Sequence, residues 1–266
     1  MVAGQLVRDA GTAGSEQFQR LRRFNLVVGL IHLAQAALML VLSNDFTLPV
    51  SRSFISGPPG AEPSSTHAFD VRLGPLVALF LLFAAADHLL TASPLLQSTY
   101  NNLLRRERND IRWIEYSVSA SLMVVLIAMI TGVSDLGALI AIGGVNACML
   151  FFGLLQERIS KPSDAEINWT PFIFGCFAGA VPWVVIALQV WTAEDLGTGG
   201  GVPGFVYGIM ISLFLLFNSF AVNMVLQYKQ VGPWRDYLFG ERAYLGLSLI
   251  AKSALAWQVF ANILID

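Results

Sequence analysis

Seven long apolar segments dominate the sequence and restrict the folds that the chain can adopt. Hydrophobic residues make up 55% of the 266 residues, and charged residues only 13%, about half the share found in soluble domains. A membrane-spanning helix needs about 20 predominantly apolar residues, and each segment is long enough to be one. We therefore predict an all-α membrane protein, a single seven-helix transmembrane domain over residues 1–266. Its helices are expected at about 24–43, 73–93, 112–131, 136–155, 170–191, 202–227 and 237–264.

The distribution of Lys and Arg predicts how these helices are oriented, because short cytoplasmic loops are enriched in both residues. With a cytoplasmic N-terminus, the outer side holds only Arg52 and Arg72, and the cytoplasmic side holds thirteen of the 16 Lys and Arg. The thirteen are Arg8, Arg20, Arg22, Arg23, Arg105, Arg106, Arg108, Arg112, Arg158, Lys161, Lys229, Arg235 and Arg242. We therefore expect a multi-pass protein of the cell (plasma) membrane with its N-terminus cytoplasmic and its C-terminus extracellular.

The first extracellular loop, 44–72, is long and carries strand signals. Two runs with β-forming residues, 46–55 and 66–71, flank the turn sequence Gly-Pro-Pro-Gly at 57–60. This arrangement predicts a β-hairpin, with a disordered loop as the alternative.

A single charged side chain, Lys252, lies in the middle of the last apolar segment. A lone ammonium at that depth costs roughly 2.5–3.5 kcal/mol on insertion scales, and such residues are functional candidates by default. Lys252 must either pair with a carboxylate or be covalently capped. A desolvated lysine amine also forms Schiff bases readily.

Three other ionisable residues lie at the same predicted depth as Lys252. At a rise of 1.5 Å per residue, Glu115, His32 and His88 are each roughly 20–24 Å from the outer end of their helix, as is Lys252. The shared layer favours one polar site built from four helices. As alternatives, either histidine could simply make a hydrogen bond between helices.

Helical periodicity adds further polar residues to this layer. Arg112, Glu115 and Ser119 fall on one stripe of their helix, so Glu115 could instead pair with Arg112. Ser248 precedes the lysine by one turn, and Gln35 follows the first histidine by three residues. Glu157, at the cytoplasmic edge, is interpreted as a solvated interface residue. Asp87 neighbours the second histidine but points away from it by about 100°, and the sequence assigns it no role.

Two strings resemble the heliorhodopsins, retinal-binding seven-helix relatives of the microbial rhodopsins that insert with inverted topology. They are Arg-Trp-Ile-Glu-Tyr-Ser-Val-Ser-Ala-Ser-Leu-Met at 112–123 and Ser-Leu-Ile-Ala-Lys-Ser at 248–253. The two histidines, the hairpin-like first loop and the cytoplasmic N-terminus also match that family. The resemblance covers essentially the whole chain.

The resemblance implies that Lys252 binds retinal covalently as a protonated Schiff base, all-trans in the dark, with Glu115 as its counterion. The polar network around it would consist of His32, Gln35, His88, Ser119 and Ser248. The walls of a retinal pocket should be apolar or aromatic, and the candidates are Tyr116, Met123, Trp183 and Phe217.

Two departures from ion-pumping rhodopsins indicate a photoreceptor without net ion transport. Pumps usually carry an Asp four residues before the lysine and a proton donor eleven residues after the counterion, where this chain has Ser248 and Leu126. The alternatives are a light-driven ion pump or channel, and a transporter or scaffold without a chromophore. We expect no enzyme activity, because no metal-ligand or nucleophile–base motif stands out, and no nucleic-acid partner, because the net charge is −2.

We also expect the protein to interact with a signalling partner that the sequence does not identify, and to form a homodimer. Gly143, Gly144 and Gly175 would allow close helix packing without specifying a dimer.

Overall fold

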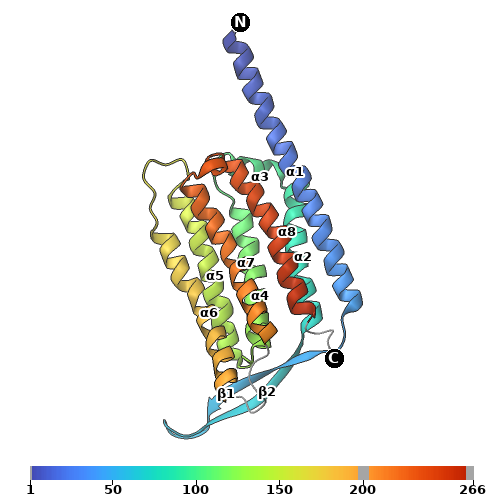
Figure 1. Ribbon diagram of the computed structural model, residues 1–266, viewed down its shortest axis with the longest axis vertical. Coiled ribbons are helices and arrows are strands. Elements are labelled where there is room, and N and C mark those ends of the chain that lie inside the picture. The colour runs from blue at the N-terminus through green and yellow to red at the C-terminus, as the bar shows by residue number, and fades with distance from the viewer. Residues whose placement is uncertain (1, 197–203, 262–266) are drawn as a thin grey trace.

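The computed structural model describes residues 2–196 and 204–261 as a bundle of seven long helices with a β-hairpin at one end (Figure 1). The long helices are α1 (Val2–Leu42), α2 (Leu73–Ala92), α4 (Asp110–Ile130), α5 (Leu136–Ile159), α6 (Thr170–Leu196), α7 (Gly204–Tyr228) and α8 (Tyr237–Ala261). A short helix, α3 (Gln97–Leu104), and a 3₁₀ turn, η1 (Gly232–Arg235), lie at the other end. We call the two ends of the bundle the hairpin end and the α3 end. The predicted seven-helix fold with a hairpin is confirmed.

The long helices have the composition of membrane spans. All seven contain a stretch that is long and apolar enough to cross a membrane. Large apolar side chains point outward from them, including Val41, Phe177 and Trp191, whose exposed fractions are 81%, 72% and 72%. A surface of this kind is unfavourable in water and suits lipid. The chain is therefore a multi-pass membrane protein.

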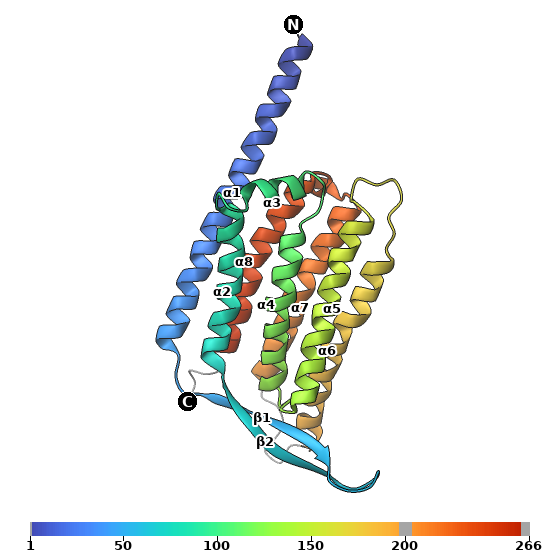
Figure 2. The ribbon, with the colours of Figure 1, turned by 180° about the vertical axis from the view of Figure 1, so that it is seen from behind.

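Several helices differ from the predicted segments at their ends. Figure 2 shows α1 extending far beyond the bundle, because it begins at Val2 rather than near residue 24. The residues before Phe24 are polar and rich in Arg, so hydropathy detects only the apolar part of this helix. Helix α5 continues past residue 155 to Ile159, because its polar residues Gln156 and Glu157 are buried. Residues 202–203 and 262–264 of the last two predicted segments lie outside the described residues.

The hairpin is formed by β1 (Thr47–Ile55) and β2 (Pro63–Arg72), which pair in antiparallel register from Thr47–Arg72 to Ile55–Pro63. Its turn includes Gly60 with φ of +97°, a conformation that glycine adopts without strain. The hairpin is tied to the bundle by Asp135, the N-cap of α5. This carboxylate accepts hydrogen bonds from the backbone N–H groups of Ala138 and Ser53, both at 3.0 Å. These hydrogen bonds, first of all that from Ala138, hold the pKa of Asp135 below its ordinary value.

The long helices from α1 to α6 each pack against the next one, and α8 contacts α7, α1 and α2. The interior is divided along the bundle axis. The half nearer the hairpin is apolar, with fully buried Phe80, Met123, Leu126 and Phe260. The half nearer α3 contains aromatic and charged side chains. Gly143 and Gly175 pack closely against neighbouring helices within the bundle. A Cβ added at Gly143 would lie 3.2 Å from Val125, and one added at Gly175 would lie 3.3 Å from Phe152, whereas a Cβ at Gly144 would meet open space.

Candidate functional site

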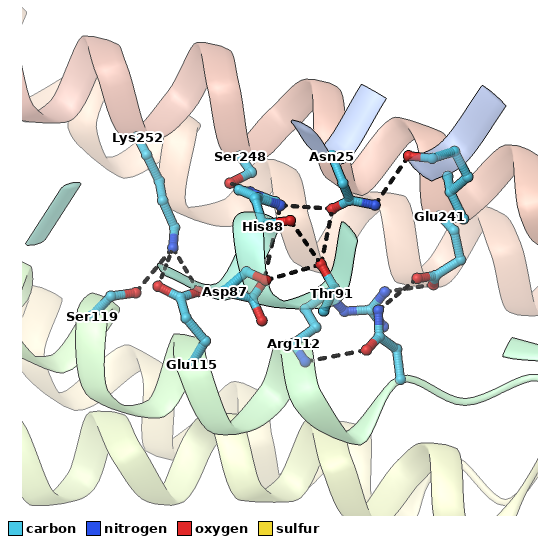
Figure 3. Close-up of polar contacts among 12 residues, drawn as sticks. Asn25, Asp87, His88, Thr91, Arg112, Glu115, Ser119, Glu241, Ser248 and Lys252 are labelled. Atoms are coloured by element: carbon cyan, nitrogen blue, oxygen red, sulfur yellow. Dashed lines mark hydrogen bonds and ion pairs between the residues drawn. The ribbon is translucent and has the colours of Figure 1, made fainter. Parts of the chain in front are cut away.

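Lys252 is held by one carboxylate and one hydroxyl in the middle of the bundle. Its Nζ donates to Glu115 Oε1 at 2.6 Å, to Glu115 Oε2 at 2.7 Å and to Ser119 Oγ at 3.0 Å (Figure 3). These contacts use all three donors of an ammonium group. The side chains of the ion pair are only 5% and 9% exposed. The cation is therefore compensated locally, as a buried charge requires.

Local helix geometry places these groups on facing surfaces. Glu115 and Ser119 are one turn apart on α4, so both point toward α8, and Ser248 lies one turn from Lys252 on α8. Asn109 is the N-cap of α4, because its side-chain oxygen accepts a hydrogen bond from Arg112 N in the first turn.

The two histidines form a second layer beside this pair. His88 Nδ1 lies 2.9 Å from Asn25 Oδ1, and His88 Nε2 lies 2.8 Å from Ser248 Oγ. Because an amide oxygen only accepts, Nδ1 carries a proton and Nε2 of the neutral ring accepts from the Ser248 hydroxyl. His32 stacks on His88 with ring centroids 5.9 Å apart and an interplanar angle of 14°. Within the described residues neither nitrogen of His32 makes a hydrogen bond, although the Ser248 backbone is close.

Arg112 belongs to a different cluster, nearer the α3 end. It pairs with Glu157 and Glu241 rather than with Glu115, and all three side chains are at most 4% exposed. Its guanidinium also lies 3.7 Å from the centroid of the Tyr244 ring. The interpretation of Glu157 as a solvated residue is therefore wrong. Its place at the end of a helix concealed that Asn109 and Arg112, at the start of α4, bind it.

Sequence reasoning missed Glu241 and Asn25. Glu241 precedes Arg242 near the start of the last span, and its position there gave no signal that separates it from a solvated residue. Asn25 lies within the first apolar segment, and a polar side chain at that position is the one signal that could have identified it. Both side chains are at most 2% exposed.

An apolar cavity of about 260 Å³ extends from Lys252 between the helices. Lys252 is the only charged residue among the described residues that line it, and Tyr116, Trp183 and Phe217 contribute to its walls. Its volume is close to the lower end of the range for small-molecule pockets. An apolar ligand with one carbonyl end fits this lining, because the walls are apolar and the single amine is at the wall.

Two of the predicted site residues lie elsewhere. Met123 is fully buried in the apolar core and is absent from the cavity lining described above. Gln35 Oε1 accepts a hydrogen bond from Trp257 Nε1 at 3.0 Å, on the hairpin side of Lys252. Neither residue is among the hydrogen-bond partners of Lys252 or among the described residues that line the cavity.

Comparison with known proteins identifies the family of the chain. A sequence profile of the heliorhodopsin family matches residues 21–264, almost the full length of the chain. No curated protein matches the chain significantly. Heliorhodopsins are light-sensing rhodopsins with a retinal chromophore in a membrane, rather than a family of enzymes. Because the match includes all seven spans and the residues that surround Lys252, the chain belongs to the heliorhodopsin family.

Proposed function

We propose that this protein is a light-sensing photoreceptor that carries retinal on Lys252 and performs no net ion transport. The observation that carries the proposal is the Lys252–Glu115 ion pair at the wall of an apolar cavity. A buried amine with one carboxylate partner and an apolar chamber beside it has the parts that a covalently bound polyene needs.

Each polar residue has a distinct role in this proposal. Lys252 binds all-trans retinal as a protonated Schiff base, and Glu115 is the counterion that keeps the cation stable. Ser119 supports both through its hydrogen bond to the lysine nitrogen. Retinal, when bound, supplies a double-bond isomerisation driven by light.

Glu115, His32 and His88 then hold the proton that leaves the lysine nitrogen. Imidazole suits this task because its unperturbed pKa lies near physiological pH. Ser248 connects His88 to α8, one turn from Lys252. Tyr116, Trp183 and Phe217 form part of the wall against which the apolar group packs.

The absence of net transport is inferred from the one-sided distribution of polar groups. Asp87, Arg112, Glu157 and Glu241 all lie in the α3 half of their helices. On the hairpin side of Glu115, α4 presents Met123, Val124, Leu126 and Ile127, each at most 2% exposed. The described residues therefore provide no ionisable relay from Lys252 toward the hairpin end. A proton released from Lys252 would leave and return on the same side.

The excess of Lys and Arg on the α3 side supports an orientation with that end in the cytoplasm. The N-terminus would then be cytoplasmic and the C-terminus extracellular. A homodimer and a signalling partner remain predictions of the sequence. A partner that reads the light signal would meet the cytoplasmic α3 end.

Retinal binding is tested by the absorption spectrum of the purified protein with added retinal, in the dark and after illumination. Wild type should gain a visible band that hydroxylamine bleaches in the light, and Lys252→Ala should stay colourless. Lys229→Ala, which removes a lysine near the α3 end, is the matched control and should keep the band. A pigment with normal visible absorption in Lys252→Ala would refute the attachment site.

Transport is tested by photocurrents in a planar membrane or transfected cell, at several voltages and with gradients of H⁺, Na⁺ and Cl⁻. We expect an intact photocycle without sustained current. A sustained, light-dependent current would overturn the sensor proposal and favour a light-driven pump or channel.

A further inference from the structure

Asp87 is a buried carboxyl group that the proposed function leaves without a role. It lies on α2, directly before His88, and its side chain is 10% exposed. Its Oδ1 has no hydrogen-bond partner within the described residues. Its Oδ2 is 3.9 Å from His88 Nδ1, but that nitrogen is already bonded to Asn25. Within the described residues, the Asp87 carboxyl group is therefore only weakly held, with one unpaired oxygen and one long contact to His88.

Both buried cations near Asp87 are already neutralised by other residues. Lys252 is held by Glu115, and Arg112 is held by Glu157 and Glu241. An ionised Asp87 would be a buried anion without a compensating cation, which is costly. Geometry therefore favours a neutral carboxylic acid at this position, with a proton that can be given up.

Asp87 also lies on the way from Lys252 to the α3 end. Figure 3 shows it between the Lys252–Glu115 pair and the group that contains Thr91 and Arg112. It lines a small cavity of about 10 Å³ together with Asn109, Arg112 and Glu241. Such a volume is about one water-sized probe sphere, and its walls are polar, so the cavity suits a relay of protons.

The charged and titratable groups around Asp87 come from four elements. They are His88 on α2, Tyr100 on α3, Arg112, Glu115 and Tyr116 on α4, and Glu241, Tyr244 and Lys252 on α8.

We propose that Asp87 is a proton donor that returns a proton to the Lys252 nitrogen and is itself refilled from the α3 end. The proposal rests on the proposed function, in which Lys252 loses its proton after illumination. In the step that follows, the O–H bond of Asp87 breaks, its proton binds the lone pair of the lysine nitrogen, and a carboxylate remains. The proton held by Glu115, His32 and His88 is released toward the α3 end, and the Asp87 carboxylate takes up one proton from that end through the polar cavity, so the protein ends in its starting state without net transport.

The first test follows the photocycle of retinal-loaded wild type, Asp87→Asn and Asp87→Glu by flash photolysis at several pH values. A positioned acid typically contributes 10²–10⁴-fold to a proton transfer, so recovery of the visible band should be about a hundredfold slower in Asp87→Asn. Without an internal donor the proton comes from bulk water, so recovery should slow about tenfold for each unit rise in pH. Wild type and Asp87→Glu should recover at a rate independent of pH near neutrality.

The unilluminated spectrum should be the same in wild type and Asp87→Asn, which separates a donor role from a structural one. Recovery of Asp87→Asn at the wild-type rate, with no pH dependence, would overturn the proposal.

A second test does not depend on retinal. Infrared difference spectra between wild type and Asp87→Asn, both without retinal at neutral pH, should contain the C=O band of a neutral carboxylic acid. A carboxylate band in its place would reject Asp87 as the donor, whether or not the protein forms a pigment. Failure of wild type to form a pigment, with the carboxylic-acid band present, would instead count against the proposed function.

Discussion

Replacing Glu115 with Gln removes the single carboxylate that neutralises Lys252. The shape of the side chain is retained, so the change acts on charge. Removing one partner of a buried ion pair typically costs about 3–5 kcal/mol, because the other charge is left uncompensated. The side chains of this pair are only 5% and 9% exposed, so little of that figure is lost to solvent screening. At about 1.4 kcal/mol for each factor of ten, the protonated form of the Lys252 nitrogen becomes roughly 100- to 5,000-fold less favourable.

An absorption titration of the retinal-loaded variant measures this effect. Glu115→Gln should lose its visible band near neutral pH in favour of a near-ultraviolet form, or keep the band only when a halide replaces the missing anion. Glu115→Asp retains the charge and should stay visible. Glu157→Gln is a second control, because it makes the same change in the Arg112 cluster, away from Lys252. An unchanged visible spectrum of Glu115→Gln from about pH 5 to about pH 9, without a halide effect, would refute the reasoning.

Three further predictions concern orientation, stability and pH. A C-terminal epitope tag should be accessible on intact cells and an N-terminal tag should not; the reverse pattern would contradict the inferred topology. Arg112→Gln should lower the free energy of unfolding by about 3–5 kcal/mol, because two buried carboxylates lose their cation, and adding Glu157→Gln should recover part of that loss; thermal denaturation in detergent measures both, and no recovery would count against the cluster as the cause. The depressed pKa of Asp135 means that its contribution to holding the hairpin is present above the ordinary Asp value of 3.8 and is lost as the pH falls through the lower folded value. Hydrogen exchange of the Ser53 amide, corrected for its intrinsic rate, should therefore accelerate on acidification in wild type, and Asp135→Ala should be fast throughout; equal rates in both proteins at neutral pH would argue against this contact.

The sequence by itself predicted the membrane spans, the hairpin and the common depth of Lys252 and Glu115. Each of these depends only on the order and spacing of residues along the chain. Apolar length gives the spans, turn residues between β-forming runs give the hairpin, and a constant rise per residue converts position into depth. The same information could not give the start of α1, because a helix can continue into water after its apolar part ends.

The tertiary structure decided which side chains share a contact. Arg112 and Glu115 lie on one stripe of α4, yet they belong to separate clusters, because Arg112 pairs with Glu241 on α8 and Glu157 on α5, whereas Glu115 pairs with Lys252 farther along α8. Glu241 and Asp87 show the same limit, since neither position in the sequence reveals the rotation of its helix about its own axis. Depth is fixed by the chain, but rotation is set by how all seven helices pack together. Only the packed bundle therefore shows that Lys252 has a carboxylate partner of its own and that, among the described residues, no Lys or Arg side chain pairs with Asp87.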